Sequence, residues 1–380
     1  MSEHRIRLGM VGGGEGAFIG GVHRIAARLD DNFALVAGCF GSTPERSRAG
    51  ADGLGVDPAR TYGTFAEMAE AEAAREDGIQ AVSIVTPNHV HFAAAKAFLE
   101  HGIHVICDKP LTSTLEDART LVDVAGKADA LFVLTHNYTG YPMVRQAQQM
   151  VASGSLGPLR VVQVEYPQDW LTEAIDIKQA EWRTDPARSG AGGSTGDIGT
   201  HAFNLAGFVT GLELESLAAD LQAFVPGRPL DDNAHVLLRF KGGARGMLWS
   251  SQVAPGNENA LRLRVYGERG GLEWAQEDPN YLWHSPFGEP KRLITRGGAG
   301  AREAANRLSR IPPGHPEGYL EGFANIYSEA AAAIRARAAG TAPPAGVMFP
   351  TVGDGLAGVR FVDACVRSSA ADAAWVTLAE

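Results

Sequence analysis

The fold of this chain is set by its opening stretch, Ile6-Arg7-Leu8-Gly9-Met10-Val11-Gly12-Gly13-Gly14. Its apolar residues are typical of a buried strand, and its glycines are typical of the turn at which such a strand meets a helix. Backbone N–H groups at this kind of turn approach a pyrophosphate closely, and the positive end of the following helix favours that negative charge. The stretch therefore predicts the first strand of a nucleotide-binding βαβ unit.

The glycine loop fits the G-x-G-x-x-G/A pattern in two ways. One alignment ends at Ala17, and the other ends at Gly20 after a three-residue extension. We favour Gly12, Gly14 and Gly20 as the cofactor-binding glycines. Glycines also serve tight turns for steric reasons alone, so the argument depends on the strand that precedes them.

The first third of the chain alternates short apolar runs with amphipathic stretches. Strands are expected at 6–11, 33–40, 80–85, 103–107 and 130–135, and helices at about 20–29, 43–52, 64–75, 89–101 and 114–128. Short, wholly apolar strands are typical of a parallel sheet covered on both faces. This pattern predicts an α/β fold with a doubly wound Rossmann domain over residues 1–136.

Beyond residue 136 the strands become longer and alternate polar with apolar residues. They are expected at Leu159–Tyr166, Ala234–Phe240, Ala244–Gln252 and Leu261–Tyr266. The alternation predicts a mostly antiparallel sheet with one covered face and one face open to solvent or to a partner subunit. We expect an α/β substrate-binding and oligomerisation domain at 137–345, followed by a helical segment at 346–380 that packs back on the protein. A homodimer or homotetramer through the open face is predicted.

Composition excludes several classes of protein. The chain has 380 residues, 45% hydrophobic and 21% charged, as expected of a folded globular protein of two domains. A formal net charge of -10 argues against a nucleic-acid or anionic-membrane partner. Three cysteines without metal-like spacing favour a reducing cytoplasm. No signal sequence or apolar membrane-spanning window is seen.

The end of the second expected strand bears on the choice between NAD and NADP. An acidic residue there would bind the ribose of NAD, but Leu35–Phe40 is followed by Gly41, Ser42 and Thr43. Ser42 and Arg46 are candidates for a 2′-phosphate, so the sequence leans slightly towards NADP and leaves NAD(P) unresolved. The alternative is that this run is only a helix N-cap with Arg46 in solvent.

A polar run, Thr86-Pro87-Asn88-His89-Val90-His91, follows the strand Ala81–Val85. Ligands of doubly wound folds gather at the carboxyl ends of strands, so this run is expected near the nicotinamide. Cofactor contacts are expected from Thr86, Pro87, Asn88 and His91, and a substrate contact from His89. Helix capping is the alternative. The His-x-His pair has no third ligand at a matching spacing, so no metal site is predicted.

Lys109 and His201 are the residue types that alcohol oxidation requires. As hydride leaves the carbon, a base must take the hydroxyl proton and a cation must stabilise the developing oxyanion. Lys109 follows an apolar strand in Cys107-Asp108-Lys109-Pro110, and His201 stands four residues after Asp197. On a helix, Asp197 and His201 would share one face. A solvated lysine and a structural histidine bonded to Asp197 are the alternatives.

Taken in order, these motifs resemble those of the Gfo/Idh/MocA oxidoreductases, named for glucose-fructose oxidoreductase and inositol dehydrogenase. The resemblance covers nearly the whole chain. It rests on the glycine loop with His23, Thr86-Pro87-Asn88 with His91, Asp108-Lys109-Pro110 where the family usually has Glu-Lys-Pro, Trp182-Arg183-Thr184-Asp185-Pro186, and Gly192-Gly193 leading to Asp197-x-Gly199-x-His201.

The resemblance implies a Rossmann domain and an α/β domain with a large open sheet, with the substrate between the domains. It implies that Lys109 contacts the reacting hydroxyl and the nicotinamide, that Asp197 positions the substrate and that His201 is the general acid/base. Asn204 departs from the family, in which an aspartate is frequent three residues after the histidine. This departure bears on how His201 is oriented.

Further substrate contacts are expected from the second domain. Tyr138 is a candidate for hydrogen bonding to a sugar, and the others are Asp169, Trp170 and Arg183. Stacking of Trp170 on a sugar competes with the commoner role of a core tryptophan. The Gly-, Arg- and Pro-rich stretch 297–316, with Arg307 and His315, is expected to be a mobile loop over a site.

The leading hypothesis is an NAD(P)-dependent dehydrogenase acting on a hydroxyl of a sugar, sugar derivative or cyclitol. Some members of the resembled family instead cleave glycosides through a transient keto-sugar, without net cofactor turnover, and this alternative stays open. A non-catalytic nucleotide-binding sensor is the third hypothesis. It would predict the loss of Lys109 or His201, and both are present.

Overall fold

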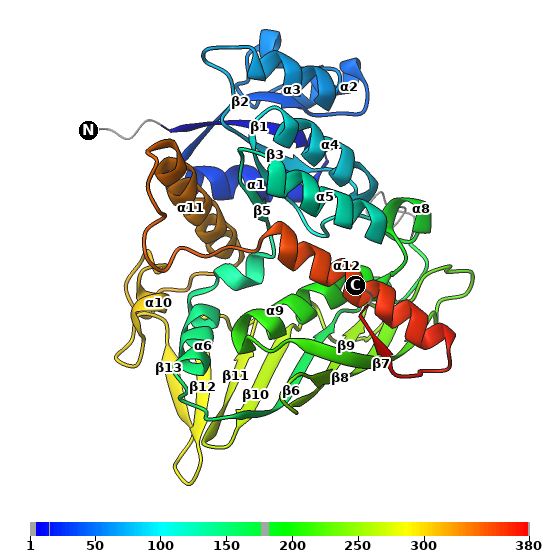
Figure 1. The fold of residues 1–380 in the computed structure, drawn as a ribbon, viewed down its shortest axis with the longest axis vertical. Coiled ribbons are helices and arrows are strands. Elements are labelled where there is room, and N and C mark those ends of the chain that lie inside the picture. Colours follow the sequence, from blue (N-terminus) through cyan, green and yellow to red (C-terminus); the bar gives the residue numbers. More distant parts are fainter. Residues whose placement is uncertain (1–4, 15, 176–181, 379–380) are drawn as a thin grey trace. The chain divides into compact units, whose positions relative to one another are not determined.

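The computed structural model describes residues 5–14, 16–175 and 182–378, and the chain divides into two units (Figure 1). Unit 1 comprises Met1–Thr112, Glu116–Asn137 and Tyr319–Leu356. Unit 2 comprises Ser113–Leu115, Tyr138–Gly318 and Ala357–Glu380. Each unit is built on one sheet.

Unit 1 contains a five-stranded parallel sheet with the strand order β2-β1-β3-β4-β5. The strands are β1 (Ile6–Gly12), β2 (Phe33–Cys39), β3 (Ala81–Val85), β4 (His104–Cys107) and β5 (Phe132–Leu134). Leu8 of β1 pairs with Leu35 of β2 on one side and with Ala81 of β3 on the other. The predicted Rossmann sheet is confirmed, and the central strands β1 and β3 end at the glycine loop and at Thr86.

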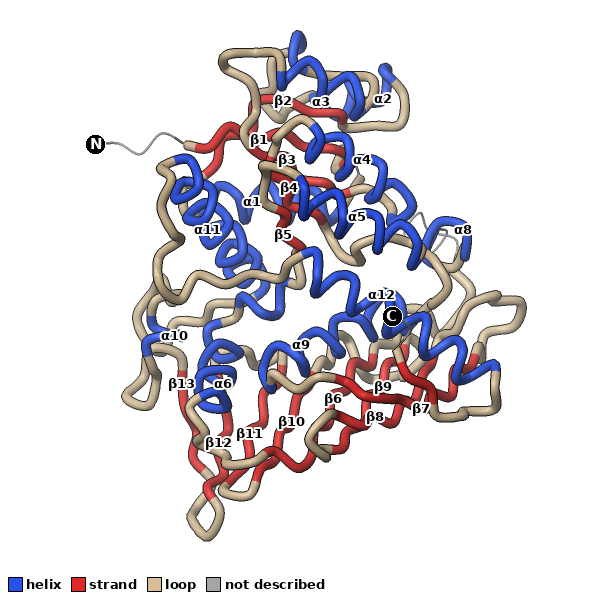
Figure 2. Tube along the Cα trace, viewed as in Figure 1, coloured by secondary structure: helices blue, strands red, loops and turns tan. Residues whose placement is uncertain are grey.

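Helices cover the sheet of unit 1 (Figure 2). They are α1 (Phe18–Leu29), α2 (Pro44–Ala51), α3 (Phe65–Ala73), α4 (Asn88–Glu100), α5 (Leu115–Lys127) and α11 (Tyr319–Ala338), with the short helices η1 (Pro58–Arg60) and η2 (Asn137–Gly140). Helix α12 (Val352–Ala370) begins in unit 1 and ends in unit 2.

Helix α11 belongs to unit 1, whereas the sequence predicted a second domain running through 137–345. The reason is its apolar face, because Phe323 and Tyr327 are buried in the same core as Val22 and Ala26 of α1. Figures 1 and 2 both show α11 beside α1. The returning segment 319–356 therefore completes the Rossmann core.

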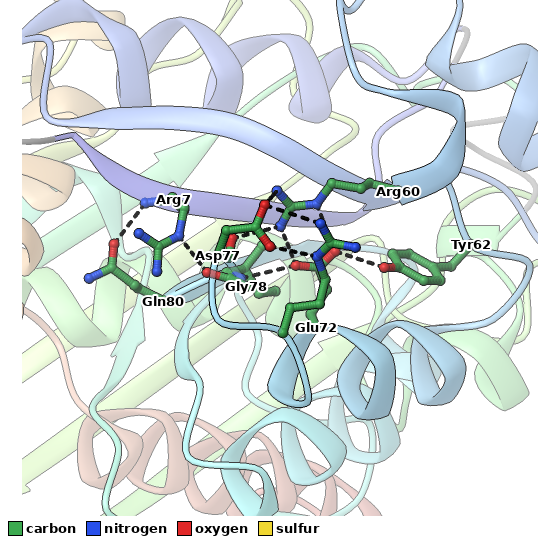
Figure 3. Close-up of polar contacts among 9 residues, drawn as sticks. Arg7, Arg60, Tyr62, Glu72, Asp77, Gly78 and Gln80 are labelled. Carbon is green, nitrogen blue, oxygen red and sulfur yellow. Dashed lines mark hydrogen bonds and ion pairs between the residues drawn. The ribbon is translucent and has the colours of Figure 1, made fainter.

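A buried polar cluster fixes the chain between β2 and β3 (Figure 3). The carboxylate of Glu72, on α3, accepts hydrogen bonds from the Nε of Arg60 at 3.0 Å, the hydroxyl of Tyr62 at 2.8 Å and the backbone N–H of Ile79 at 3.0 Å. A second guanidinium nitrogen of Arg60 also contacts Glu72. Tyr62 N–H donates to the carbonyl of Gly38, so the cluster is attached to β2 next to its carboxyl end.

Unit 2 contains a nine-stranded sheet with the order β13-β12-β11-β10-β6-β9-β8-β7-β14. The strands are β6 (Leu159–Pro167), β7 (Leu214–Gln222), β8 (Asn233–Phe240), β9 (Arg245–Ser251), β10 (Arg262–Gly267), β11 (Gly270–Ala275), β12 (Tyr281–Pro286), β13 (Arg292–Thr295) and β14 (Val376–Thr377). Neighbouring strands are antiparallel except β6 and β9, which are parallel. The predicted mostly antiparallel sheet is confirmed.

One face of the nine-stranded sheet is covered by helices α6 (Pro142–Ala152) and α9 (Thr200–Thr210) (Figure 1). The inward side chains of β6 are buried, while Val161, on the opposite face of that strand, is 38% exposed. The opposite face, called here the outward face, carries other partly exposed apolar side chains: Leu237, Met247, Tyr266, Tyr281, Trp283 and Leu293. The alternation in the sequence predicted this two-sided sheet.

Short helical segments connect the sheet of unit 2 to its helices. They are α8 (Pro186–Ser189), the π-helical turn Thr195–Gly199, labelled η3, and α10 (Glu303–Asn306). The stretch 297–316, predicted as a mobile loop, is tied to Arg296. The Arg296 side chain is 2% exposed, forms an ion pair with Glu317 at 3.0 Å and donates to the carbonyl of Ile311 at 2.8 Å.

Candidate active site

The nucleotide loop lies between β1 and α1. An ideal Cβ on Gly14 would lie 2.3 Å from the carbonyl oxygen of Phe40, and one on Gly20 would lie 2.3 Å from the Cα of Gly13. Gly20 thus lets α1 pack tightly against the loop, which is the role of the third glycine in the fingerprint. Helix α1 begins at Phe18 with Ala17 as its N-cap, and that side chain offers no capping group. The turn and helix end fit a bound pyrophosphate.

The end of β2 carries Ser42 and Arg46. Thr43 caps α2 by accepting the backbone N–H of Arg46 at 3.3 Å, so the capping interpretation holds for Thr43. The exposed Arg46 guanidinium donates to the hydroxyl of Ser42 at 3.5 Å. Both side chains therefore lie together beyond β2, where an adenine ribose is bound in folds of this type.

The turn after β3 is joined to the turn after β4 by His91. This ring is fully buried, with Nδ1 2.7 Å from the carbonyl oxygen of Pro110 and Nε2 2.9 Å from that of Thr86. Burial lowers the pKa of His91, so the ring favours its neutral form, which donates from one nitrogen only. His91 thus lies between the Thr86 turn and the Lys109-Pro110 turn and donates to one of their two carbonyl oxygens, and its predicted contact with a cofactor stays a prediction.

Asn88 and His89 begin helix α4. Asn88 is 7% exposed, whereas His89 is on the exposed side of the first turn. Pro87 is the N-cap residue of the helix. The turn that the sequence placed near the nicotinamide is therefore at the carboxyl end of β3, next to the nucleotide loop.

Asp108 and Lys109 follow β4 directly. The carboxylate of Asp108 accepts the hydroxyl of Thr135 at 3.0 Å and lies 3.6 Å from Nε2 of His23. Burial raises the pKa of Asp108, but the hydrogen bond and charge of His23, with the charge of Lys109, outweigh burial and hold this pKa well below its usual range. Asp108 is therefore an ionised neighbour of the half-buried Lys109.

His23 extends this polar network into the core of unit 1. Its Nδ1 lies 2.8 Å from the hydroxyl of Tyr327, which also hydrogen-bonds the hydroxyl of Ser83. After β5, burial and the charge of Lys109 lower the pKa of His136 to about 4. The carboxyl ends of β1, β3, β4 and β5 therefore lie at the edge of the sheet that carries Lys109, and most of the predicted cofactor residues follow them.

In unit 2, the turn η3 and helix α9 place Asp197 and His201 one helical turn apart. The carboxylate of Asp197 accepts the side-chain amide of Gln252 at 2.9 Å and the Nε of Arg183 at 3.2 Å. The His201 ring is 8% exposed. Because Asp197 lies in the π-helical turn and not in α9, the predicted sharing of one α-helical face with His201 stays a prediction.

Tyr138 packs on His201. The two ring centroids are 4.9 Å apart at an interplanar angle of 74°. The Tyr138 hydroxyl bonds that of Tyr166, which donates to Asn259 at 2.7 Å, and burial raises the pKa of Tyr138. Tyr138 is 4% exposed and contacts His201, and its predicted hydrogen bond to a sugar stays a prediction.

The other predicted substrate residues separate into two groups. The guanidinium carbon of Arg183 lies 5.9 Å from the ring centroid of Trp170 and 4.3 Å from that of Trp182. Because Arg183 also donates a hydrogen bond to Asp197, it connects Trp170 to that carboxylate. Trp170 Nε1 donates to Gln168 at 3.0 Å. The carboxylate of Asp169 instead accepts the N–H of Gly256 at 3.1 Å, which directs it to a neighbouring turn.

Several residues of the site were missed from the sequence. Gln252 and Tyr166 were each only the last residue of an expected strand, so neither stood in a motif. Asp231 accepts hydrogen bonds from the loop that leads to Asp197. Asp231 stands in no motif, so no signal in the sequence marked it.

A hollow of about 670 Å³ lies elsewhere in unit 2. Trp249 and Asn233 line it from the outward face, together with Phe224 and Pro226. None of the predicted site residues lines it, so the hollow is not part of the site assigned to His201.

In the described part of the chain, no group of three or more His, Cys, Asp and Glu side chains is placed to hold a metal ion. No described helix is long and apolar enough to cross a membrane.

Comparison with known proteins gives matches over both units. Residues 6–136 match an oxidoreductase family with an NAD-binding Rossmann fold, and residues 144–273 match the GFO/IDH/MocA C-terminal domain. The uncharacterized oxidoreductase YfiI of Bacillus subtilis is 36% identical over 378 residues, which cover 98% of this chain and 96% of that protein.

Solved structures give the same result. An oxidoreductase from Sinorhizobium meliloti is 64% identical, with a TM-score of 0.92 and coverage of 99% of this chain and 100% of that chain. An inositol dehydrogenase homolog from Azotobacter vinelandii, complexed with NADH and myo-inositol, is 40% identical, with a TM-score of 0.93 and coverage of 98% of each chain.

Proposed function

Because the chain belongs to the Gfo/Idh/MocA oxidoreductase family, we propose that it is an NAD(P)-dependent dehydrogenase of a sugar, sugar derivative or cyclitol. The reaction moves a hydride between a secondary hydroxyl carbon and the nicotinamide. The observation that carries the proposal is Asp197, held by Gln252 and Arg183 one helical turn before His201. The solved homolog with NADH and myo-inositol supports the substrate class.

The proposal assigns three side chains to the reaction. His201 takes the hydroxyl proton as general base, and returns it when the reaction runs in reverse. The Lys109 ammonium stabilises the negative charge that develops on the same oxygen. Asp197, whose carboxylate is fixed by Gln252, accepts a hydrogen bond from the substrate and orients it. When bound, the nicotinamide ring accepts the hydride.

The residues that would hold the nucleotide are those of unit 1. For the pyrophosphate, Gly12 and Gly14 lie in the turn before α1 and Gly20 lies in the first turn of that helix, and Thr86 and Asn88 lie at the end of β3 for the nicotinamide side. Between the two nucleotides we propose NADP. Gly41, Ser42 and Thr43 stand directly after Phe40, where an acidic residue would repel a 2′-phosphate, and Arg46 lies beside Ser42 there.

The test is a spectrophotometric assay of the purified protein. It is mixed with NAD or NADP and with free sugars, myo-inositol and other cyclitols, and glycosides, while the absorbance of reduced nicotinamide is followed. A rise with a free sugar or cyclitol is expected and identifies both substrate and cofactor. Cleavage of a glycoside without a rise would instead identify a redox-neutral glycosidase. No reaction with any compound, although the nucleotide binds, would overturn the proposal.

We also propose that two or four copies associate through the outward face. Leu237 of β8 and Met247 of β9 are directly paired across strands, and Val161 of β6 pairs with Tyr266 of β10. These side chains are 38–55% exposed and form an apolar strip over four strands, interrupted between β9 and β6 by Gln163 and Arg245, which pair with Met247 and Val161. Exposed apolar side chains gathered in this way are typical of protein–protein interfaces.

A further inference from the structure

We propose that Asp231 is a positioning residue for Asp197, because its carboxylate holds the loop from which the Asp197 turn begins. The inference rests on the proposed function and names a further residue of the same site. Asp231 lies just before β8, far in the sequence from the turn that it holds.

Four hydrogen bonds join Asp231 to this loop. Oδ1 accepts the N–H of Gly193 at 2.8 Å, and Oδ2 accepts both the N–H and the hydroxyl of Thr195, each at 2.8 Å. The N–H of Ser194 donates to the backbone carbonyl of Asp231 at 2.8 Å. Every residue from Gly193 to Thr195 thus donates at least one hydrogen bond to Asp231.

The connection continues to Asp197 through the backbone. Its N–H donates to the carbonyl of Gly193 at 2.9 Å. The π-helical turn that starts at Thr195 holds one more residue per turn than an α-helix, which changes the direction in which Asp197 points relative to His201. Such turns depend on bonds at their ends, and Asp231 supplies them at the N-terminal end.

Two features show how closely the loop and Asp231 fit. An ideal Cβ on Gly193 would lie 2.0 Å from the backbone oxygen of Asp231, so only glycine allows this approach. Asp231 is 9% exposed, and none of the described residues forms an ion pair with it. Burial raises its pKa, while the donors from Thr195 and Gly193 act in the opposite direction. Three donors converge on this side chain, so it must accept hydrogen bonds at both of its terminal atoms. A carboxylate does so, whereas the amide of asparagine has one atom that donates.

The adjacent residue, Asp232, provides a matched control. It is also fully buried, and its carboxylate also accepts several hydrogen bonds. Those bonds come from the N–H groups of Phe224 and Val225 at 2.9–3.0 Å and from Arg228 at 3.1 Å. Asp232 therefore fixes a different turn, with an ion pair to Arg228 in addition to its backbone donors. A general loss of stability would appear in Asp232→Asn at least as much as in Asp231→Asn.

The experiment measures amide hydrogen exchange in peptides spanning 192–201 for the full-length wild type, Asp231→Asn, Asp232→Asn and Thr195→Val. Steady-state kinetics with myo-inositol, or with the panel compound that the wild type oxidises, and nucleotide affinity by fluorescence accompany it. Thr195→Val removes only the hydroxyl donor, so it keeps the test valid if Asp231→Asn does not fold.

Asp231→Asn is expected to accelerate exchange in 192–201 by about tenfold or more, because one amide N–H then faces a donor. The kcat/KM for the alcohol falls by roughly 10²-fold, with a raised KM, while nucleotide affinity is unchanged. Thr195→Val gives a smaller change in the same direction, and Asp232→Asn leaves 192–201 protected.

Unchanged exchange in Asp231→Asn, or equal acceleration in Asp232→Asn, would overturn the inference. So would faster exchange with an unaltered kcat/KM and KM for the alcohol. Failure of the proposed function is recognised separately: the wild type then oxidises no compound of the panel, yet the exchange data still decide whether Asp231 holds the turn.

Discussion

The aspartates around the candidate site have different electrostatic surroundings. Asp108 is stabilised as an anion by His23 and Lys109, and its pKa is lowered despite burial. Asp231 has only uncharged donors, and burial raises its pKa. One carboxylate therefore supplies charge beside Lys109, whereas the other supplies geometry for the turn of Asp197. The same residue type has two roles because of its neighbours.

Replacement of Lys109 by alanine removes the cation assigned to the developing oxyanion. We expect kcat to fall by roughly 10²–10⁴-fold, while nucleotide affinity changes little, because the glycine loop is untouched. Turnover and nucleotide binding are measured side by side. The control is Lys96→Ala, at a helix position whose side chain is 42% exposed and lies 3.8 Å from Glu100. It should leave turnover and nucleotide affinity unchanged. Normal turnover of Lys109→Ala would refute the role of this lysine.

Replacement of Arg46 by alanine tests the choice of nucleotide. The KM for NADP is expected to rise by about tenfold, because a charge-assisted hydrogen bond to the 2′-phosphate is lost, while the KM for NAD stays unchanged. The neighbouring exposed Arg48→Ala should leave both constants unaltered. An equal change with both nucleotides would show that Arg46 acts only through helix α2.

Sequence reasoning located the residues that stand in motifs at strand ends, such as Lys109 and Asn88. It located them because an apolar run followed by polar residues marks the carboxyl end of a buried strand. It could not predict the roles of Gln252 and Asp231, because the residues that they bond lie 55 and 36–38 positions away in the sequence. Tyr138 was located by its place after the last strand of the first sheet, and its contact with the His201 ring could not be read from the sequence.

At the scale of elements, apolar periodicity predicted the strands of both sheets. The limits appear where tertiary packing decides. Nothing local in 317–338 indicates that the helix returns to the Rossmann core, and the loop that leads into Thr195–Gly199 is bonded to Asp231, 36–38 residues away. The segment 297–316 has the composition of a mobile loop, yet the buried Arg296–Glu317 pair fixes its ends.

The connection between β2 and α3 depends on the charge of Glu72 (Figure 3). Burial raises the pKa of Glu72, but Arg60 and Tyr62 outweigh burial and lower it below its ordinary value of 4.5. The stabilisation is therefore complete above about pH 4.5 and is lost as the pH falls through the lowered value. Glu72→Gln should cost about 3 kcal/mol in the free energy of unfolding near pH 7, because Arg60 is left buried without its partner.

Urea denaturation at pH 7 and at progressively lower pH measures this effect. The difference between wild type and Glu72→Gln should shrink as the medium becomes acidic. Tyr62→Phe, which removes one hydrogen bond and no charge, should cost only ~1 kcal/mol and serves as the matched variant. A cost that does not depend on pH would contradict the assignment of an ionised Glu72.

At the scale of the whole molecule, the outward face of unit 2 is expected to form the subunit interface. Leu237→Glu combined with Met247→Glu places two carboxylates directly opposite each other in the apolar strip, which disfavours association. Sedimentation velocity should show a shift from dimer or tetramer to monomer. Leu29→Glu, at a position of unit 1 that is 43% exposed, should leave the sedimentation coefficient unchanged. A double variant that sediments like the wild type would exclude this interface.

Unit 1 is completed by a helix that follows unit 2 in the chain. During synthesis on the ribosome, Val22 and Ala26 emerge early, but Phe323 and Tyr327, which cover them, emerge some three hundred residues later. The nucleotide-binding unit of the nascent chain therefore carries an uncovered apolar stripe until translation is almost finished. Unit 2 also depends on the end of the chain, because Phe203 stacks on Phe361 and the edge strand β14 pairs with β7. Neither unit can therefore close its core until the last part of the chain has been made.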